Sequence, residues 1–235
     1  MARGAIWAAI AGTLAGELAQ GLYPAGAKLP TEAELAARFG VNRHTVRHAL
    51  ADLAAKGLVV SRRGAGVFVA SRPTDYAIGR RVRFNENVTA AGQVPSRELT
   101  RLETRVAAGH EAAALGLEPG ALVQVVEGVS LADGQPIAMF RSVFPAARFS
   151  GLLDALREVP SITMALAAAG VDDYVRASTR VTAKAAKPVQ ALRLRLREGA
   201  PILRTEAVNV DGAAVPVEYG LTWFAGERVT LTLSV

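Results

Sequence analysis

Cysteine is absent from all 235 residues of the sequence. Its absence excludes a disulfide scaffold, thiolate catalysis and a cysteine-ligated zinc site, and it suits a protein of the reducing cytoplasm. Long apolar runs are also missing, because no stretch approaches the roughly 18 residues that a membrane-spanning helix needs. We therefore expect a cytoplasmic protein without a membrane span.

Histidine is scarce, with three in the chain. Two of them, His44 and His48, lie four residues apart in VNRHTVRHAL (residues 41–50), a spacing at which two imidazoles on one helix face could hold a metal ion. A zinc site needs a third ligand, and the zincin pattern needs a glutamate directly after the first histidine, where this sequence has a threonine. Arg43 and Arg47 share the spacing and would repel a dication, so we expect a polyanion here and no metal site.

The N-terminal stretch MARGAIWAAIAGTLAGELAQG has an early arginine and then apolar residues, which is also the pattern of a signal peptide. However, Ile6, Ile10, Leu14 and Leu18 recur every four residues, and the polar side chains fall outside this stripe. That periodicity is typical of an amphipathic helix. We interpret the segment as the first helix of a globular domain.

The net charge of +6 is unevenly distributed. Residues 1–72 contain 9 basic and 4 acidic side chains, whereas residues 73–235 contain 18 and 17. Nearly all the excess positive charge therefore lies in the first third of the chain. This indicates a basic module that binds an anion larger than a metabolite.

Start and stop signals in this basic module predict a helix-turn-helix. Thr31 and Glu34 form the capping-box pattern T-x-x-E, and Gly40 is a typical helix end. A third helix is expected from the N-cap Asn42 to Gly57. The strand-like runs LVVSRR and VFVAS, joined by GAG, predict a hairpin, so that residues 1–72 form a winged helix-turn-helix domain.

The glycine-rich segment RRGAG (residues 62–66) could be mistaken for a phosphate-binding loop. It lacks the spacing of nucleotide-binding motifs and joins two strands instead of opening a helix. A wing tip that approaches a DNA groove explains it better.

The remainder of the chain predicts an α+β domain. We take residues 73–85 as a linker and residues 86–235 as the second domain. Strand-like runs alternate there with short helices, and two Asp-Gly pairs, at 133–134 and 211–212, predict hairpin turns. This order indicates one antiparallel sheet with helices packed against it.

The segment KLPTEAELAARFGVNRHTVRHALADLAAKGLVVSRRGAGVFV (residues 28–69) resembles the winged helix-turn-helix of GntR-type bacterial repressors, in which LP(S/T)E, (F/Y)GV(S/N)R.TVR.AL and G.G.(F/Y)V recur at these intervals. The second domain resembles the ligand-sensing UTRA domain of the HutC branch, a chorismate-lyase-like α+β fold. The segment RPTDYAIGRRVRFNENVTAAG is most similar to regulators of phosphonate metabolism. The resemblance implies a homodimeric DNA-binding repressor controlled by a small anionic effector, with no cofactor.

Two sets of residues follow from the resemblance by position. The implied DNA contacts are Thr31, Asn42, Arg43, His44, Arg47, Arg63 and Gly64, with Thr45 and Arg62 as phosphate contacts. The implied effector contacts are Arg83, Phe84, Asn85, Arg141, Ser161, Thr163, Arg180 and Glu218. Ser161 is also an N-cap by its place before a helical run, and the free N–H groups of a helix start attract anions.

Two alternatives remain. The sensing fold resembles a lyase, so an enzyme is conceivable, but no paired carboxylates, Ser/His/Asp set or metal cluster stands out after residue 75. An architectural DNA-binding protein would need a second domain without a pocket. Sugar-phosphate sensors of this branch carry paired arginines before the first hairpin turn, and EGVSLADG has none, which argues against a sugar-phosphate effector.

Overall fold

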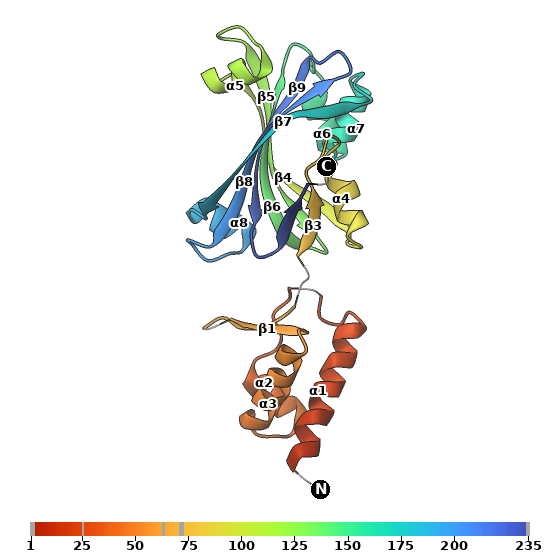
Figure 1. Cartoon of the computed structure of the whole chain (residues 1–235), viewed down its shortest axis with the longest axis vertical. Coiled ribbons are helices and arrows are strands. Elements are labelled where there is room, and N and C mark those ends of the chain that lie inside the picture. Colours follow the sequence, from red (N-terminus) through yellow and green to blue (C-terminus); the bar gives the residue numbers. More distant parts are fainter. Residues whose placement is uncertain (1–2, 25, 63, 71–72, 234–235) are drawn as a thin grey trace. The chain divides into compact units, whose positions relative to one another are not determined.

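The chain divides into two compact units, residues 1–72 and 73–235 (Figure 1). The structure is a computed structural model that describes residues 3–24, 26–62, 64–70 and 73–233. Within these ranges, no helix has the length and apolar character needed to cross a membrane.

The N-terminal unit contains three helices and a hairpin. The helices pack around a core that includes Leu14, Leu35, Val46 and Leu53, all of which are fully buried. The apolar stripe of the first helix therefore faces the core, as its periodicity predicted, except for Ile6, which is exposed. The elements are α1 (Arg3–Ala19), α2 (Glu32–Phe39), α3 (Arg43–Ala55), β1 (Val59–Arg62) and β2 (Gly66–Val69), and β1 pairs antiparallel with β2.

Capping hydrogen bonds and backbone conformation confirm the predicted boundaries between α2 and α3. The Thr31 hydroxyl accepts a hydrogen bond from the backbone N–H of Glu34, whose carboxylate accepts one from the backbone N–H of Thr31. Gly40 ends α2 in the left-handed conformation, with φ of 64°. Asn42 caps α3 by accepting from the N–H of Thr45. These local bonds fix the short turn between α2 and α3.

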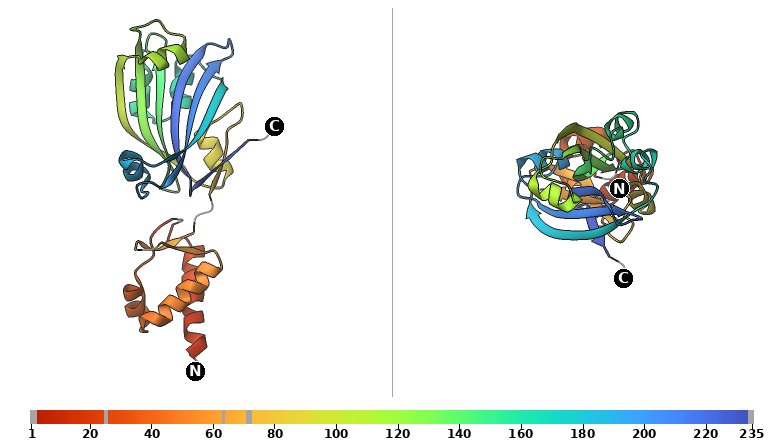
Figure 2. Two further views of the ribbon diagram at one scale, coloured as in Figure 1. Left: turned by 60° about the vertical axis from the view of Figure 1, so that its left-hand side comes forward. Right: turned by 90° about the horizontal axis from the view of Figure 1, so that it is seen from above.

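The C-terminal unit is built on a six-stranded antiparallel sheet in the order β4-β5-β6-β9-β8-β7, so that β4 and β7 are its edges (Figure 2). Its strands are β4 (Pro95–Val106), β5 (Leu122–Ala132), β6 (Gln135–Pro145), β7 (Tyr174–Ala185), β8 (Pro201–Asp211) and β9 (Pro216–Ala225). Its helices are α4 (Phe84–Ala90), α5 (Gly109–Leu115), α6 (Leu152–Glu158), α7 (Ile162–Ala168) and α8 (Pro188–Leu194). The α+β prediction is confirmed.

Different helices cover the two faces of the sheet. Apolar clusters join α6 and α7 to one face, and α4 packs on the same side; we name this the inner face. Helices α5 and α8 pack on the other face. Because side chains alternate between the faces along a strand, each position belongs to one side or the other.

The segment expected to be a linker and two short helices differ from the sequence-based expectation. Residues 73–85, expected to be a linker, contain strand β3 (Thr74–Ala77) and the start of α4. Strand β3 pairs in parallel with β10 (Val229–Thr232). The partner of β3 lies 155 residues further on, which local patterns could not reveal. The short helices α4 and α6 were also not anticipated.

Candidate functional site: the exposed face of α3 and an arginine-lined cavity

The exposed face of α3 carries the arginines and histidines of the motif. Arg43, His44, Arg47 and His48 are all exposed, while Val46 on the opposite side is buried. The His44 and His48 rings stack with centroids 5.8 Å apart. Among the described residues no group of three or more potential metal ligands occurs.

The two arginines of α3 differ in what holds them. Arg47 forms a two-point ion pair with Glu32 of α2, with Nε–Oε1 at 3.0 Å and a terminal nitrogen at 2.7 Å from Oε2. The hydrogen bond from Arg47 lowers the pKa of the Glu32 carboxyl below its usual value. No described residue forms a hydrogen bond or ion pair with Arg43. Arg43 is therefore available to a ligand at once, whereas Arg47 must exchange a partner.

The remaining expected DNA contacts lie around the same turn. Thr31, Asn42 and Thr45 use their side chains in the two helix caps. Gly64 lies between the hairpin strands with φ of 74°, a conformation that favours glycine. Arg63 and the side chain of Arg62 lie outside the described residues.

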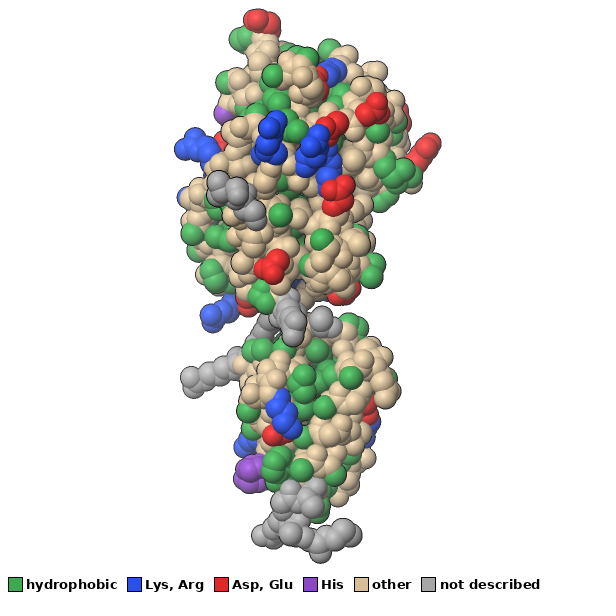
Figure 3. All heavy atoms as spheres, turned by 45° about the vertical axis from the view of Figure 1, so that its right-hand side comes forward, with side chains coloured by type: hydrophobic (Ala, Val, Ile, Leu, Met, Phe, Trp, Pro, Cys, Tyr) green, Lys and Arg blue, Asp and Glu red, His purple; other side chains and the backbone are tan. Residues whose placement is uncertain are grey.

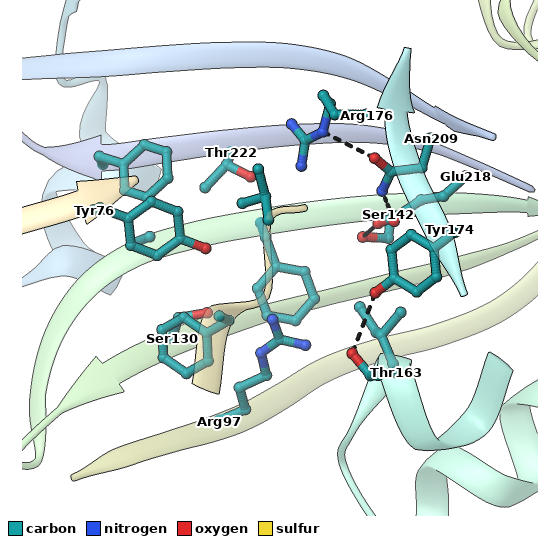
Figure 4. A pocket seen from close by; sticks show the side chains of 16 residues that line it. Tyr76, Arg97, Ser130, Ser142, Thr163, Tyr174, Arg176, Asn209, Glu218 and Thr222 are labelled. Atoms are coloured by element: carbon teal, nitrogen blue, oxygen red, sulfur yellow. Dashed lines mark hydrogen bonds between the residues drawn. The ribbon is translucent and has the colours of Figure 1, made fainter. Parts of the chain in front are cut away.

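A cavity opens on the inner face of the C-terminal sheet (Figure 4). Its volume is about 80 Å³, which limits any occupant to a small molecule. Strands from both edges and the middle of the sheet contribute, together with β3, α4 and α7. The charged side chains that line it are Arg97, Arg176 and Glu218.

Glu218 is the anchor of a hydrogen-bonded chain on one wall of this cavity. Its carboxylate accepts from the Ser142 hydroxyl at 2.5 Å and from the Asn209 amide at 2.6 Å. The amide oxygen of Asn209 accepts in turn from Nε of Arg176 at 2.8 Å. Glu218, Asn209 and Ser142 are all less than a tenth exposed. These hydrogen bonds hold the Glu218 carboxylate and the Arg176 guanidinium in fixed positions.

Arg97 enters the cavity from β4, the opposite edge of the sheet from β7, which carries Arg176 (Figure 4). Its guanidinium carbon lies 4.8 Å from the Phe84 ring centroid and 4.9 Å from that of Phe140. Its Nε is buried without a hydrogen-bond partner, and no hydrogen bond from its terminal nitrogens to a described residue is present. Burial lowers the pKa of Arg97 from its ordinary value because the charged form loses hydration. Because no described residue accepts from the Arg97 guanidinium, its N–H groups are candidates for binding an anion in the cavity.

The chain matches two family models. Residues 8–69 match "Bacterial regulatory proteins, gntR family", and residues 90–230 match "UTRA domain", which is more than half of the chain. The chain belongs to the GntR family of regulators and carries a UTRA domain.

Individual relatives agree with this membership. An HTH-type transcriptional regulator of Rhizobium meliloti strain 1021 is 39% identical over 97% of this chain and 94% of its own length. A protein of Escherichia coli strain K12 named "Probable transcriptional regulator PhnF" is 34% identical over 95% and 92%. The crystal structure of PhnF from Mycobacterium smegmatis superposes with a TM-score of 0.66 at 27% identity and covers 96% of this chain and 98% of that one. This GntR-family chain is thus a DNA-binding transcriptional regulator.

Only part of the expected effector set lines the cavity of this regulator. Phe84, Thr163 and Glu218 do, and the Thr163 hydroxyl lies 3.2 Å from the Tyr174 hydroxyl. Ser161 caps α7 by accepting from the N–H of Met164, next to the lining residues but not among them.

The other four expected residues have different surroundings. Arg83 is buried, donates to the Tyr174 carbonyl at 2.9 Å and stacks on its ring at 3.6 Å. Asn85 is exposed. Arg141 is on the outer face, ion-paired with Glu127, because positions 140 and 142 point inward. Arg180 is exposed on β7 opposite Glu206. None of these four residues lines the cavity.

Sequence reasoning missed Arg97 and Arg176, the two cations of the cavity. One signal was available for Arg97. It shares its strand face with Leu99, two residues on, so that alternation places a charged side chain on an apolar face. A cation in such a position calls for a functional explanation.

Proposed function

We propose that this regulator is a repressor that binds an operator as a homodimer and whose operator affinity changes when a small anionic molecule, such as phosphate or a phosphonate, enters the cavity. The unpartnered guanidinium of Arg97 is the observation that carries the effector part of the proposal. Binding, not catalysis, is proposed because the named relatives are transcriptional regulators.

On the DNA side, we assign base reading to Arg43, which is exposed and unpaired among the described residues. An arginine that donates two hydrogen bonds to a guanine edge contributes about 1–3 kcal/mol of discrimination. Arg47 and His44 lie on the same face, near the N-terminal end of α3, where the helix dipole favours phosphate. Thr31, Asn42 and Thr45 lie at the starts of α2 and α3, and we assign these helix starts to contacts with the DNA backbone.

The wing has a separate role in the proposal. Arg62 ends β1 and Gly64 lies in the turn before β2, the part of a winged domain that follows the DNA backbone, and Arg63, outside the described residues, stands between them in the sequence. Contacts of this kind carry no sequence information. Replacing Arg62 with alanine should weaken binding to all sequences alike and lower the salt slope by about one.

Strand β3 offers a route from the cavity to the DNA-binding unit. It begins at Thr74, directly after the boundary between the units, and its Tyr76 lines the cavity. A ligand that moves Tyr76 would act on the segment that leads to the wing. A coupling free energy of about 1–3 kcal/mol is enough to change operator occupancy.

Dimerisation is proposed through the second unit, because a helix-turn-helix protein gains specificity for a palindrome by pairing two half-sites about one helical turn apart. The measurement is the solution mass by light scattering at micromolar concentration. A monomer that binds one half-site per chain would contradict this part.

The whole proposal is tested in two steps. Selection from genomic fragments first yields an operator, and fluorescence anisotropy then measures affinity with and without phosphate, methylphosphonate or a sugar phosphate. We expect at least one of these anions to change the operator affinity fivefold or more. Arg97→Gln should abolish that change without altering affinity in the absence of the anion. An operator affinity that no anion shifts would contradict the effector part.

A further inference from the structure

We propose that the cavity takes a short zwitterion, with an oxyanion at Arg97 and Arg176 and an ammonium group at Glu218. This inference rests on the proposed function, in which the cavity is the effector site. It narrows the ligand from any small anion to one that carries both charges.

The anionic end of the ligand is assigned to Arg97 and Arg176, whose guanidinium groups have N–H donors that no described residue uses. A guanidinium has five N–H donors. None of those on Arg97 bonds a described residue, and the flanking Phe84 and Phe140 rings fix its direction. Arg176 uses Nε on Asn209 and one terminal nitrogen at 3.5 Å from the Thr179 hydroxyl, which leaves its other terminal nitrogen for a ligand.

The cationic end of the ligand is assigned to Glu218, a carboxylate with no cationic partner among the described residues. Glu218 is 8% exposed and is held only by the neutral donors of Ser142 and Asn209. An ionised carboxylate has about four acceptor positions, so two remain. Within the described part of the chain, no lysine or arginine forms an ion pair with it. A ligand ammonium group would supply the missing partner of a buried charge.

Arg97 and Glu218 both line the cavity and do not form an ion pair with each other. Arg97 is on β4 and Glu218 is on β9, three strands away in the sheet order, and Arg97 is in register with Phe224, six residues along β9 from Glu218. The sheet therefore holds the opposite charges apart with the cavity between them, as Figure 4 shows. A molecule with a negative and a positive end can satisfy both at once.

The charge balance favours a phosphoryl-type oxyanion over a carboxylate. The three charged lining residues sum to +1 at neutral pH. A phosphoryl-type group carries about −1.5 to −2 at pH 7, so that together with one ammonium group it nearly cancels this charge. An amino acid is neutral overall and leaves the cavity positive.

The test is calorimetry on the full chain with three probes, 2-aminoethylphosphonate, ethylphosphonate and β-alanine. The first two differ by the amine alone, and β-alanine replaces the phosphonate with a carboxylate. We expect wild type to bind 2-aminoethylphosphonate at least tenfold more tightly than either of the others. In Glu218→Gln the preference over ethylphosphonate should fall to about twofold or less, without loss of ethylphosphonate binding.

Two further variants make the result specific. Arg97→Gln should weaken both phosphonates alike. Glu127→Gln removes a carboxylate from the outer face of the same sheet and should leave the tenfold preference intact. A melting curve for each variant confirms that it is folded.

Three results would overturn the inference. Equal binding of the two phosphonates by wild type, with loss in Arg97→Gln, refutes the zwitterion but leaves the anionic effector standing. Equal binding of β-alanine and 2-aminoethylphosphonate refutes the phosphoryl-type end. Binding of none of the three refutes the inference entirely, and the operator titrations with phosphate and sugar phosphates then decide the proposed function separately.

Discussion

The arginines of α3 and those of the C-terminal cavity have the same chemistry in opposite settings. Arg43 and Arg47 extend from a helix surface into water, and the side chain of Arg47 is 67% exposed. Arg97 and Arg176 are enclosed by aromatic rings and a hydrogen-bonded network. An exposed cation is screened by salt and adjusts to its partner, whereas an enclosed one is oriented before the ligand arrives.

The contrast fits two kinds of ligand. DNA is a long polyanion whose phosphates attract cations over a distance, so flexible exposed arginines suffice for approach. A small molecule offers one or two charges and must be recognised by fixed groups in a cavity. Positive charge thus serves two purposes in this chain. On the face of the C-terminal unit shown in Figure 3, basic side chains lie beside acidic ones.

The largest expected effect is on operator affinity when the exposed arginines are removed. Arg43→Ala and Arg47→Ala should each cost about 1–3 kcal/mol of binding, and Arg43→Ala should also relax specificity at one base pair. Thermal stability should hardly change because neither side chain packs in the core. Anisotropy titrations on operator and mutated operator measure the effect.

Lys56→Ala is the matched control for these variants. Lys56→Ala removes the same charge as the arginine substitutions. Lys56 is the C-cap of α3, at the opposite end of the helix from Arg43, and its side chain pairs with Asp52. Unchanged operator affinity in the double arginine variant would refute the assignment of α3 as the reading helix.

Adding a methyl group at Gly128 should disturb the packing around Arg97 in the cavity. A Cβ there would lie 2.5 Å from the Glu98 carbonyl oxygen and 2.8 Å from the Phe140 ring, and this ring supports Arg97. Overpacking of this kind costs about 1–3 kcal/mol. We expect Gly128→Ala to lower the melting temperature of the C-terminal unit and to leave operator binding by the N-terminal unit intact.

Gly220→Ala provides the control, because a Cβ at Gly220 meets its nearest atom at 3.6 Å, an ordinary contact. Equal stability of the two variants in calorimetric scans would show that the backbone around Gly128 yields without cost.

Two ion pairs, one buried and one exposed, extend the comparison between enclosed and exposed charges. Arg105 binds Glu111 through two bonds of 2.7 Å, and the side chain of Glu111 is 3% exposed. Arg105→Ala would leave this carboxylate buried with its Ala108 backbone donor alone, at a cost of about 2–3 kcal/mol. Chemical denaturation at pH 7 measures the loss.

The pH dependence follows from the same pair. Arg105 lowers the pKa of Glu111 from its ordinary value of 4.5. A lowered folded-state pKa gives stability that is fully present above the unfolded pKa and lost as the pH falls through the folded one. Wild type should therefore lose this contribution below about pH 4.5, and Arg105→Ala should show a flatter profile there. Parallel profiles would contradict the pairing.

The smallest expected effect belongs to the exposed ion pair. Glu32→Gln removes the partner of Arg47, whose pair with Glu32 is largely solvated. Exposed pairs contribute about 0.2–1 kcal/mol, so stability should change by no more than this. Operator affinity should rise slightly, because Arg47 no longer exchanges a partner. A loss of affinity would instead show that Glu32 positions Arg47 for DNA.

The N-terminal unit was largely predictable because its signals are local. The capping box of Thr31 and Glu34, the cap at Asn42 and the end at Gly40 each depend on residues within four positions. The sequence also predicted the strands around Asp133 and Asp211, where turn chemistry and alternation are strong.

The cavity was less predictable because it depends on strand register over long distances. Alternation divides a strand into two faces but does not say which face holds the cavity, and Arg141, expected from the family resemblance by position, lies on the outer face. The pairing of strands distant in sequence brings Arg97 of β4, Arg176 of β7 and Glu218 of β9 to one cavity. No local pattern contains that information.

The parallel pairing of β3 with β10 has a consequence for how the protein folds on the ribosome. Thr74 pairs with Val229, so the small sheet cannot form until the second strand has left the exit tunnel. The N-terminal unit has short-range contacts and can fold while the rest is being made. Nascent chains would then expose a finished DNA-binding unit before the sensing unit can close around its first strand. During synthesis, a chain of this kind has the means to recognise DNA before it has the means to respond to a ligand.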